Sequence, residues 1–161
     1  MVPIIRISTN LWNETIKGLA EHSQGLRESG CIWAGKRNEL TWTVKEVLFL
    51  DDLPGVRRQH LYHRTPRIAI NKLFELLREK DLQIIADLHT HPTDWVELSD
   101  TYKLHPIEYR IGLIAVIFPY FAQMMHKFND LGVHEYLGNG EWQRLPLSEV
   151  KRRLILEEVS S

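Results

Sequence analysis

Apolar side chains follow helical spacing in one long segment of the chain and form strand-like runs in several others. Residues 67–80 carry apolar side chains from Ile70 to Leu77 at the i, i+3, i+4 and i+7 positions, a stripe that predicts one helix packed on a core. Residues 84–88 and 111–118 are continuous apolar runs, which are typical of strands buried on both faces. Helices that alternate with such strands predict an α/β fold, a mixed sheet flanked by helices.

Shorter patterns predict the remaining elements. A first helix is expected to start from a cap among residues 8–10, whose side chains can accept hydrogen bonds from the first turn, and to end at Gly25. Ser99 and Ser148 are expected to cap two later helices, the second with Leu154 facing the core. The other strands are expected over residues 2–7, 28–35, 40–50, 122–127 and 133–137, with a hairpin at 36–38 and a last strand after a tight turn at 137–142.

Composition and charge limit the class of protein. At 161 residues the chain has the size of one domain, residues 1–161, that buries around two-thirds of its unfolded surface. The formal net charge of −1 gives no electrostatic basis for general nucleic-acid binding. No apolar stretch approaches the ~20 residues of a membrane span, and the start lacks the apolar core of a signal peptide. The single cysteine, Cys31, is expected in the core and suits a reducing, cytoplasmic compartment.

A His-Thr-His-Pro sequence follows the apolar run 84–88 and is the main candidate for chemistry. Successive side chains of a strand point to opposite faces, so His89 and His91 are expected to point the same way. Both imidazoles could then reach one ion at ~2.0–2.1 Å, the distance that zinc prefers. Pro92 cannot continue a strand ladder, so the pair is expected at an exposed strand end. Alone, such a pair is more often two polar residues on one face of a strand.

The residues around this pair resemble the JAMM/MPN zinc metalloproteases, also called JAB domains. That family carries a distant upstream Glu, then His-Ser/Thr-His-Pro, and then Ser-x-x-Asp; Glu28, His89, His91 and Ser99 stand at matching positions. The resemblance implies an MPN/JAB-like fold over nearly the whole chain, a mixed curved β-sheet flanked by helices in a layered, cytidine-deaminase-like architecture. The last position departs from the pattern, because Tyr102 stands where the family has Asp.

The resemblance also implies roles for four of these residues: general base for Glu28, oxyanion contact for Ser99, and zinc ligand for His89 and His91. A catalytic zinc takes three protein ligands and keeps a fourth position for water, whose pKa it lowers towards ~7. Tyr102 occupies the third-ligand position, and its free pKa of ~10 disfavours a phenolate. Asp100 is a weak substitute, because two residues along a helix are ~200° apart around its axis.

Other residues are candidates for contact with a substrate. Trp95 and Val96 lie in the loop after the histidines and are expected either to plug that loop or to contact a substrate. The plug is favoured, since buried Trp is commonly structural. Residues 51–66 form a basic loop with little periodicity, which is expected to face water. In the resembled family a loop at this place helps to hold the ubiquitin-like substrate, which makes Arg57, Arg58 and Arg64 weak candidates.

Two functions are compatible with these residues. The first is a zinc-dependent isopeptidase or peptidase that deconjugates or processes a ubiquitin-like protein, impaired by Tyr102. Its partners would be that protein or its conjugate and E1- or E2-like enzymes, as for the small prokaryotic JAB domains of conjugation and antiphage defence operons. The second is a catalytically inactive binding module on the same fold, which would add a ubiquitin-like tail as a strand to a sheet edge. Neither function involves nucleic acid or a membrane.

Overall fold

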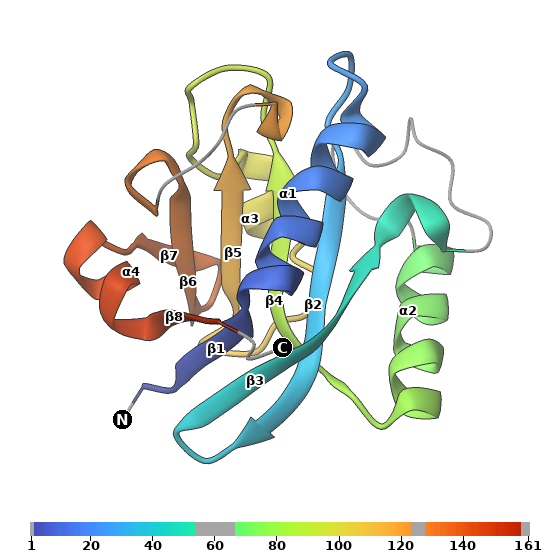
Figure 1. Cartoon of the computed structure of the whole chain (residues 1–161), viewed down its shortest axis with the longest axis vertical. Coiled ribbons are helices and arrows are strands. Elements are labelled where there is room, and N and C mark those ends of the chain that lie inside the picture. The colour runs from blue at the N-terminus through green and yellow to red at the C-terminus, as the bar shows by residue number, and fades with distance from the viewer. Residues whose placement is uncertain (1, 54–66, 124–127, 159–161) are drawn as a thin grey trace.

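The computed structural model of the protein describes residues 2–53, 67–123 and 128–158. One curved sheet of eight strands runs through this part of the chain, in the order β7-β6-β5-β4-β2-β3-β1-β8 (Figure 1). The strands are β1 (Ile4–Ser8), β2 (Gly30–Asn38), β3 (Thr41–Phe49), β4 (Gln83–Thr90), β5 (Ile114–Phe118), β6 (Gly132–Gly138), β7 (Glu141–Arg144) and β8 (Leu154–Glu157). The predicted α/β fold, a mixed sheet flanked by helices, is confirmed.

Helices cover both faces of this sheet. They are α1 (Thr9–Ser23), α2 (Arg67–Lys80), α3 (Asp100–Leu104) and α4 (Leu147–Arg153). Successive side chains of β2 point to opposite faces of the sheet. Trp33 faces α1, and its Nε1 donates to Thr15 Oγ1 of that helix at 2.9 Å. Ile32 faces the other side and packs with residues of α2. Helix α4 shares the core of α1, and α3 lies over β5 through Tyr102.

Local sequence signals predict several elements correctly. Helix α2 spans Arg67–Lys80, with Leu73 and Leu77 buried. Ser8 caps α1 by accepting from Leu11 N at 3.1 Å. Cys31 is fully buried in the core, as expected for a small apolar residue, and burial raises the pKa of its thiol.

Predictions at the C-terminal end of the described chain are wrong in two respects. Ser148 does not cap the last helix, because α4 begins at Leu147 with Pro146 at the N-cap position and no side-chain cap. Leu154 does not belong to that helix either. It begins β8, which pairs in parallel with β1 and places Leu154 opposite Ile5. Such pairing between distant segments leaves no local pattern in four residues, so periodicity could not reveal it.

Two strand predictions also need correction. The run 111–118 begins pairing only at Ile114, because Gly112 adopts a φ of +94° and leaves Ile111 70 % exposed. The predicted strand 122–127 is wrong in its described part: Ala122 belongs to a short 3-10 turn, Tyr120–Ala122, and residues 124–127 lie outside the described chain.

The turn between β2 and β3 lies later than predicted. Residues 36–38 remain paired in β2, up to the pair formed by Asn38 and Thr41. Glu39 makes the turn with a φ of 39°, a left-handed conformation that polar residues tolerate in tight turns.

The end of β4 is held on both sides by neighbouring backbone. Strand β2 runs antiparallel to β4 with Gly30 opposite His89, and β5 runs parallel to it with Ile117 opposite His89. Beyond the paired residues, Thr90 N donates to Ser29 O at 3.0 Å and His91 N donates to Phe118 O at 2.9 Å. The His-Thr-His segment therefore leaves the sheet in a fixed direction.

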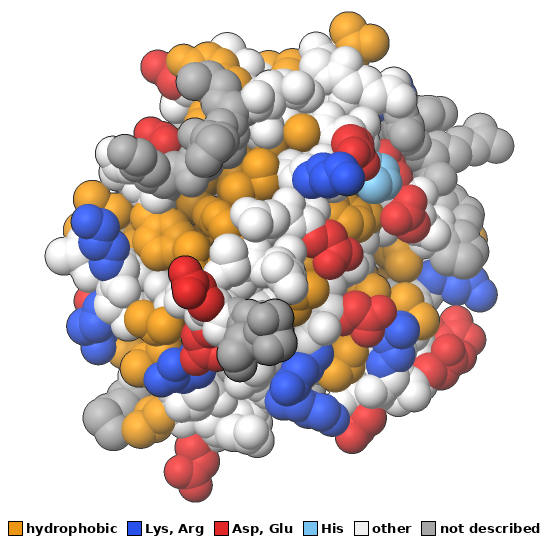
Figure 2. Space-filling model, viewed as in Figure 1, with side chains coloured by type: hydrophobic (Ala, Val, Ile, Leu, Met, Phe, Trp, Pro, Cys, Tyr) orange, Lys and Arg blue, Asp and Glu red, His pale blue; other side chains and the backbone are white. Residues whose placement is uncertain are grey.

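Charges of both signs are interspersed on the face that α1 covers, with apolar side chains between them (Figure 2). This distribution agrees with the net charge of −1 and differs from the continuous basic stripe of nucleic-acid-binding proteins. None of the described helices is long and apolar enough to cross a membrane.

We predict that Gly132→Ala destabilises the protein by about 1–3 kcal/mol or more, the usual effect of overpacking. A Cβ at Gly132 would lie 1.9 Å from the backbone oxygen of Val96, which holds the loop after the histidines against β6. Gly30→Ala is the milder comparison, because its Cβ would lie 3.1 Å from the flexible end of Leu50 and 3.3 Å from the backbone oxygen of Leu88, contacts far looser than the 1.9 Å at Gly132. Urea unfolding measures both, and equal stability of the two variants would contradict this packing.

Candidate functional site at the end of strand β4

Three polar side chains project from one face of β4 and its extension: Asp87, His89 and His91. The ring centroids of the two histidines are 5.5 Å apart, with the planes tilted by 58°. His91 is buried and His89 half-buried. The strand thus brings the two imidazoles together at its end, with a carboxylate two residues further inside the sheet.

A backbone carbonyl fixes the orientation of His91. Its Nδ1 lies 2.8 Å from the carbonyl oxygen of Trp95, an acceptor, so Nδ1 carries the proton and Nε2 keeps a lone pair. The Trp95 indole stacks on the imidazole at 5.1 Å with an angle of 10°. Burial lowers the pKa of His91, so the ring is neutral at neutral pH.

A third imidazole, His134 of β6, lies near this pair and was missed in the sequence. Its Nε2 donates to the carbonyl oxygen of Val96 at 2.9 Å. Burial, together with the neighbouring His91 and His134, lowers the pKa of His89 to about 3. No local sequence signal marks His134, because its proximity to His89 depends on the order β6-β5-β4 in the sheet.

Glu28 lies two residues before β2, close to the histidines in the sheet. Gly30 is opposite His89, and Thr90 N donates to Ser29 O at 3.0 Å, so the antiparallel register continues to Ser29 and Thr90. Continued by one more residue, this register predicts Glu28 beside His91. Buried hydroxyls hold this corner: Ser29 N donates to Thr90 Oγ1 at 2.9 Å. Burial raises the pKa of Glu28 to about 7, a value suited to a general base.

The predicted oxyanion and substitute-ligand residues lie on α3. Ser99 is the N-cap of this helix, and its Oγ accepts from Tyr102 N at 3.1 Å. Asp100 is exposed in the first turn. The structure therefore uses the Ser99 hydroxyl oxygen to begin the helix and leaves Asp100 in solvent.

Tyr102, which stands at the sequence position of the third ligand in the resembled family, lies buried beside His89. The ring is buried with Leu98 and Ile117, and its centroid lies 5.0 Å from that of His89. Its hydroxyl donates to Asp87 Oδ2 at 2.5 Å. Burial raises the pKa of Tyr102 well above its ordinary value, so the side chain is a neutral phenol.

Asp87 was also missed, although one acidic residue inside an apolar run is an available signal. Its side chain is buried, and burial raises its pKa to about 6, with the hydrogen bond from Tyr102 acting in the opposite direction and nearby Glu108 adding to the rise. At neutral pH the carboxylate is ionised and relies on the phenol as its donor.

These residues do not fit a tightly bound catalytic zinc. Such a site needs three protein ligands around one open position. Among the described residues, no group of three or more His, Cys, Asp and Glu side chains is arranged to hold a metal ion. His89 and His91 supply two nitrogens, and the third position is a phenol committed to Asp87.

The predicted substrate contacts have different outcomes. The two residues expected to plug the loop differ: Val96 is buried, as is Leu98 of the same loop, whereas Trp95 is 51 % exposed. The contact of Trp95 with a substrate stays a prediction. Arg57, Arg58 and Arg64 lie outside the described residues.

No model of a known protein family matches this sequence. Among solved structures, the chain is similar to protein DSY2949 from Desulfitobacterium hafniense, with a TM-score of 0.62, 15% identity and coverage of 97% of this chain and 94% of that one. A protein from Salinibacter ruber gives a TM-score of 0.54, 14% identity and 88% coverage of both chains. These two likenesses establish a shared fold. They carry no function.

A third similar structure is AF2198, a JAB1/MPN domain protein from Archaeoglobus fulgidus. Its TM-score is 0.47, with 14% identity and 97% coverage of both chains. A score at this level does not by itself establish a common fold or activity.

We predict that Tyr102→Phe lowers the free energy of unfolding by about 1–3 kcal/mol at pH 8, because it leaves a buried carboxylate without its donor. The hydrogen bond stabilises the ionised form of Asp87. Loss of the hydrogen bond should therefore lower the free energy of unfolding less near pH 5, below the Asp87 pKa of about 6. Tyr109→Phe is the matched control, since that hydroxyl is exposed. Equal urea stability of the two variants at pH 8 would contradict this account.

We predict that Glu28→Gln stabilises the protein relative to wild type as pH rises. The pKa of Glu28 is raised from 4.5 to about 7 in the folded state, so its contribution to stability is present below 4.5 and lost as pH rises through 7. Glutamine does not titrate and removes this loss. Unfolding free energies between pH 5 and pH 8 measure the difference, with Glu21→Gln on the exposed side of α1 as control. A difference from wild type that does not grow with pH would contradict the buried placement of Glu28.

Proposed function

We propose that this protein is a JAB/MPN-like domain that binds a ubiquitin-like protein or its conjugate in the cytoplasm and does not hold a catalytic zinc. The observation that carries the proposal is the buried Tyr102, whose hydroxyl donates to Asp87 at the place of the third ligand. A metal ligand at this position would require a phenolate, and the raised pKa of Tyr102 opposes its formation.

The motif residues support the kind of partner. Glu28, His89, His91 and Ser99 match the JAMM/MPN pattern, whose members act on ubiquitin-like proteins. The end of β4 presents the half-exposed Trp95 stacked on His91, a rigid aromatic surface of the kind enriched in protein interfaces. Strands β7 and β8 form the edges of the sheet, to which an extended tail could add by backbone hydrogen bonds.

A second candidate is the zinc-dependent isopeptidase. Two observations favour it: burial raises the pKa of Glu28 to about 7, and Nε2 of His91 keeps a free lone pair. Metal-ligating histidines commonly donate their other ring nitrogen to a carbonyl, as His91 does to Trp95. This candidate requires a zinc ion that the described donors do not fit.

Replacement of Tyr102 by Asp distinguishes the two candidates. We predict that wild-type protein purified with zinc present carries far less than one zinc per chain, and that Tyr102→Asp, which supplies a third donor, approaches roughly one. Elemental analysis measures the metal, and cleavage of a ubiquitin-like protein joined to lysine measures activity. Tyr102→Phe is the control, because it removes the hydroxyl and adds no donor.

Each outcome decides between the candidates. A full zinc equivalent and isopeptide cleavage in the wild type would overturn the binding-only function. Absence of zinc from both the wild type and Tyr102→Asp would overturn the resemblance on which both candidates rest. The double variant Tyr102→Asp with His91→Ala should lose any zinc that the single variant gains, because it returns the site to two donors.

A further inference from the structure

A second surface lies away from the histidines and plays no part in the proposed function. Within α3 and the loop that follows it, Leu104, Tyr109 and Ile111 are 63 %, 63 % and 70 % exposed. Leu104 and Tyr109 are neighbours in space, because the Tyr109 hydroxyl donates to Leu104 O at 3.0 Å, and large exposed apolar side chains that lie together mark interaction sites. We call residues 103–111 with Arg37 and Trp42 the 103–111 surface.

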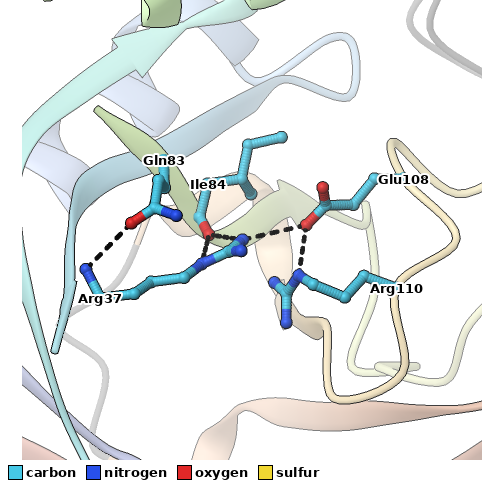
Figure 3. A network of polar contacts seen from close by, with 5 residues as sticks. All are labelled: Arg37, Gln83, Ile84, Glu108 and Arg110. Atoms are coloured by element: carbon cyan, nitrogen blue, oxygen red, sulfur yellow. Dashed lines mark hydrogen bonds and ion pairs between the residues drawn. The ribbon is translucent and has the colours of Figure 1, made fainter. Parts of the chain in front are cut away.

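Charged side chains of β2 and of the loop after α3, namely Arg37, Glu108 and Arg110, lie together (Figure 3). Arg37 Nη2 and Arg110 Nε both donate to Glu108 Oε1, at 3.1 Å and 2.9 Å. Both guanidinium groups also lie over the Trp42 ring, at 4.9 Å and 5.1 Å from its centroid. Two cations thus share one carboxylate, which leaves one positive charge in surplus.

One N–H group of the Arg110 guanidinium is not used as a donor within the described chain. Among the described residues, Arg110 Nη2 has no hydrogen-bond acceptor, although it is shielded from water. Partly buried guanidinium groups are normally paired with acceptors, and they favour carboxylates. The Arg110 side chain is 27% exposed, so a carboxylate from outside can approach the guanidinium group from its solvent side.

The backbone around this surface is held in place by hydrogen bonds. Arg37 Nε donates to Ile84 O at 3.0 Å, at the start of β4, whereas the histidines lie at the end of that strand (Figure 3). Gly112 N donates to Tyr136 O at 2.8 Å, and the Tyr109 hydroxyl donates to Leu104 O at 3.0 Å. A surface that is already ordered loses little conformational entropy when it binds.

We propose that the 103–111 surface docks a partner protein through an acidic segment flanked by apolar side chains. Charge complementarity selects this partner: a carboxylate would satisfy the surplus guanidinium, while the apolar side chains pack against Leu104, Tyr109 and Ile111. Tyr, Trp and Arg are the residues enriched at such binding centres. With Lys103 included, this surface carries three cations and one carboxylate. A surplus of two suits a short acidic segment, whereas a nucleic-acid backbone requires several cations along its phosphates.

The test uses a short acetylated peptide that alternates Leu and Asp, titrated into the full-length protein. NMR signals of the Trp42 indole N–H and the Arg110 Nε–H report binding at this surface. We expect a saturable shift of both signals. Arg110→Gln should weaken binding roughly tenfold, as expected for loss of one charge-assisted contact. Glu108→Gln should strengthen binding because it increases the surplus positive charge.

Matched controls make each outcome decisive. Arg144→Gln, on β7 and paired with Glu97, should leave binding of the peptide unchanged. Peptides in which Lys replaces Asp, or Ser replaces Leu, should bind much more weakly. The proposal is overturned if wild-type protein shows no saturable shift, if Arg110→Gln binds equally well, or if an oligonucleotide shifts these signals and the Leu/Asp peptide does not. Zinc content and isopeptide cleavage do not enter this test, so its failure is distinct from failure of the proposed function.

Discussion

The hydrogen bond from the Tyr102 hydroxyl to Asp87 is the constraint on which the candidate site depends. It joins α3 to the middle of β4 and places the phenol ring beside His89. A zinc ion held by histidines of β4 and a residue of α3 would join the same two elements. Here protein atoms alone make the joint, and a buried carboxylate without its donor would cost about 1–3 kcal/mol. The same side chain therefore stabilises the fold and, in the proposed function, takes the place of the third ligand.

The two ends of β4 carry different chemistry. At its end, burial lowers the pKa values of His89 and His91 and raises that of Glu28 to about 7, so the imidazoles are neutral at neutral pH and Glu28 is only partly charged. At its start, Arg37 and Arg110 share one carboxylate and leave a surplus positive charge. The weakly charged end of β4 is the basis for the proposed binding of an extended ubiquitin-like tail. The positively charged start is the basis for the proposed binding of an acidic segment.

Local sequence signals predicted the parts of the molecule that depend on neighbouring residues. The helical stripe of α2, the apolar run of β4 and the Ser99 cap all act within a few residues and are found as expected. Strand β8 was missed because it exists only through pairing with β1. His134 was missed for a related reason, because its proximity to the motif histidines depends on the order of the strands. Asp87 lies two residues before His89 on the same strand, a local signal, but its partner Tyr102 is set by tertiary packing. The Tyr102 departure was visible in the sequence, but its hydrogen-bond partner was not.

The most direct measurement of the central claim is anomalous scattering at the zinc absorption edge from crystals of the wild-type protein grown with zinc. The account predicts no anomalous peak within bonding distance of His89 and His91, and electron density for the Tyr102 hydroxyl against Asp87. A peak at ~2.0–2.1 Å from a nitrogen of each imidazole, with Tyr102 moved away from Asp87, would contradict it.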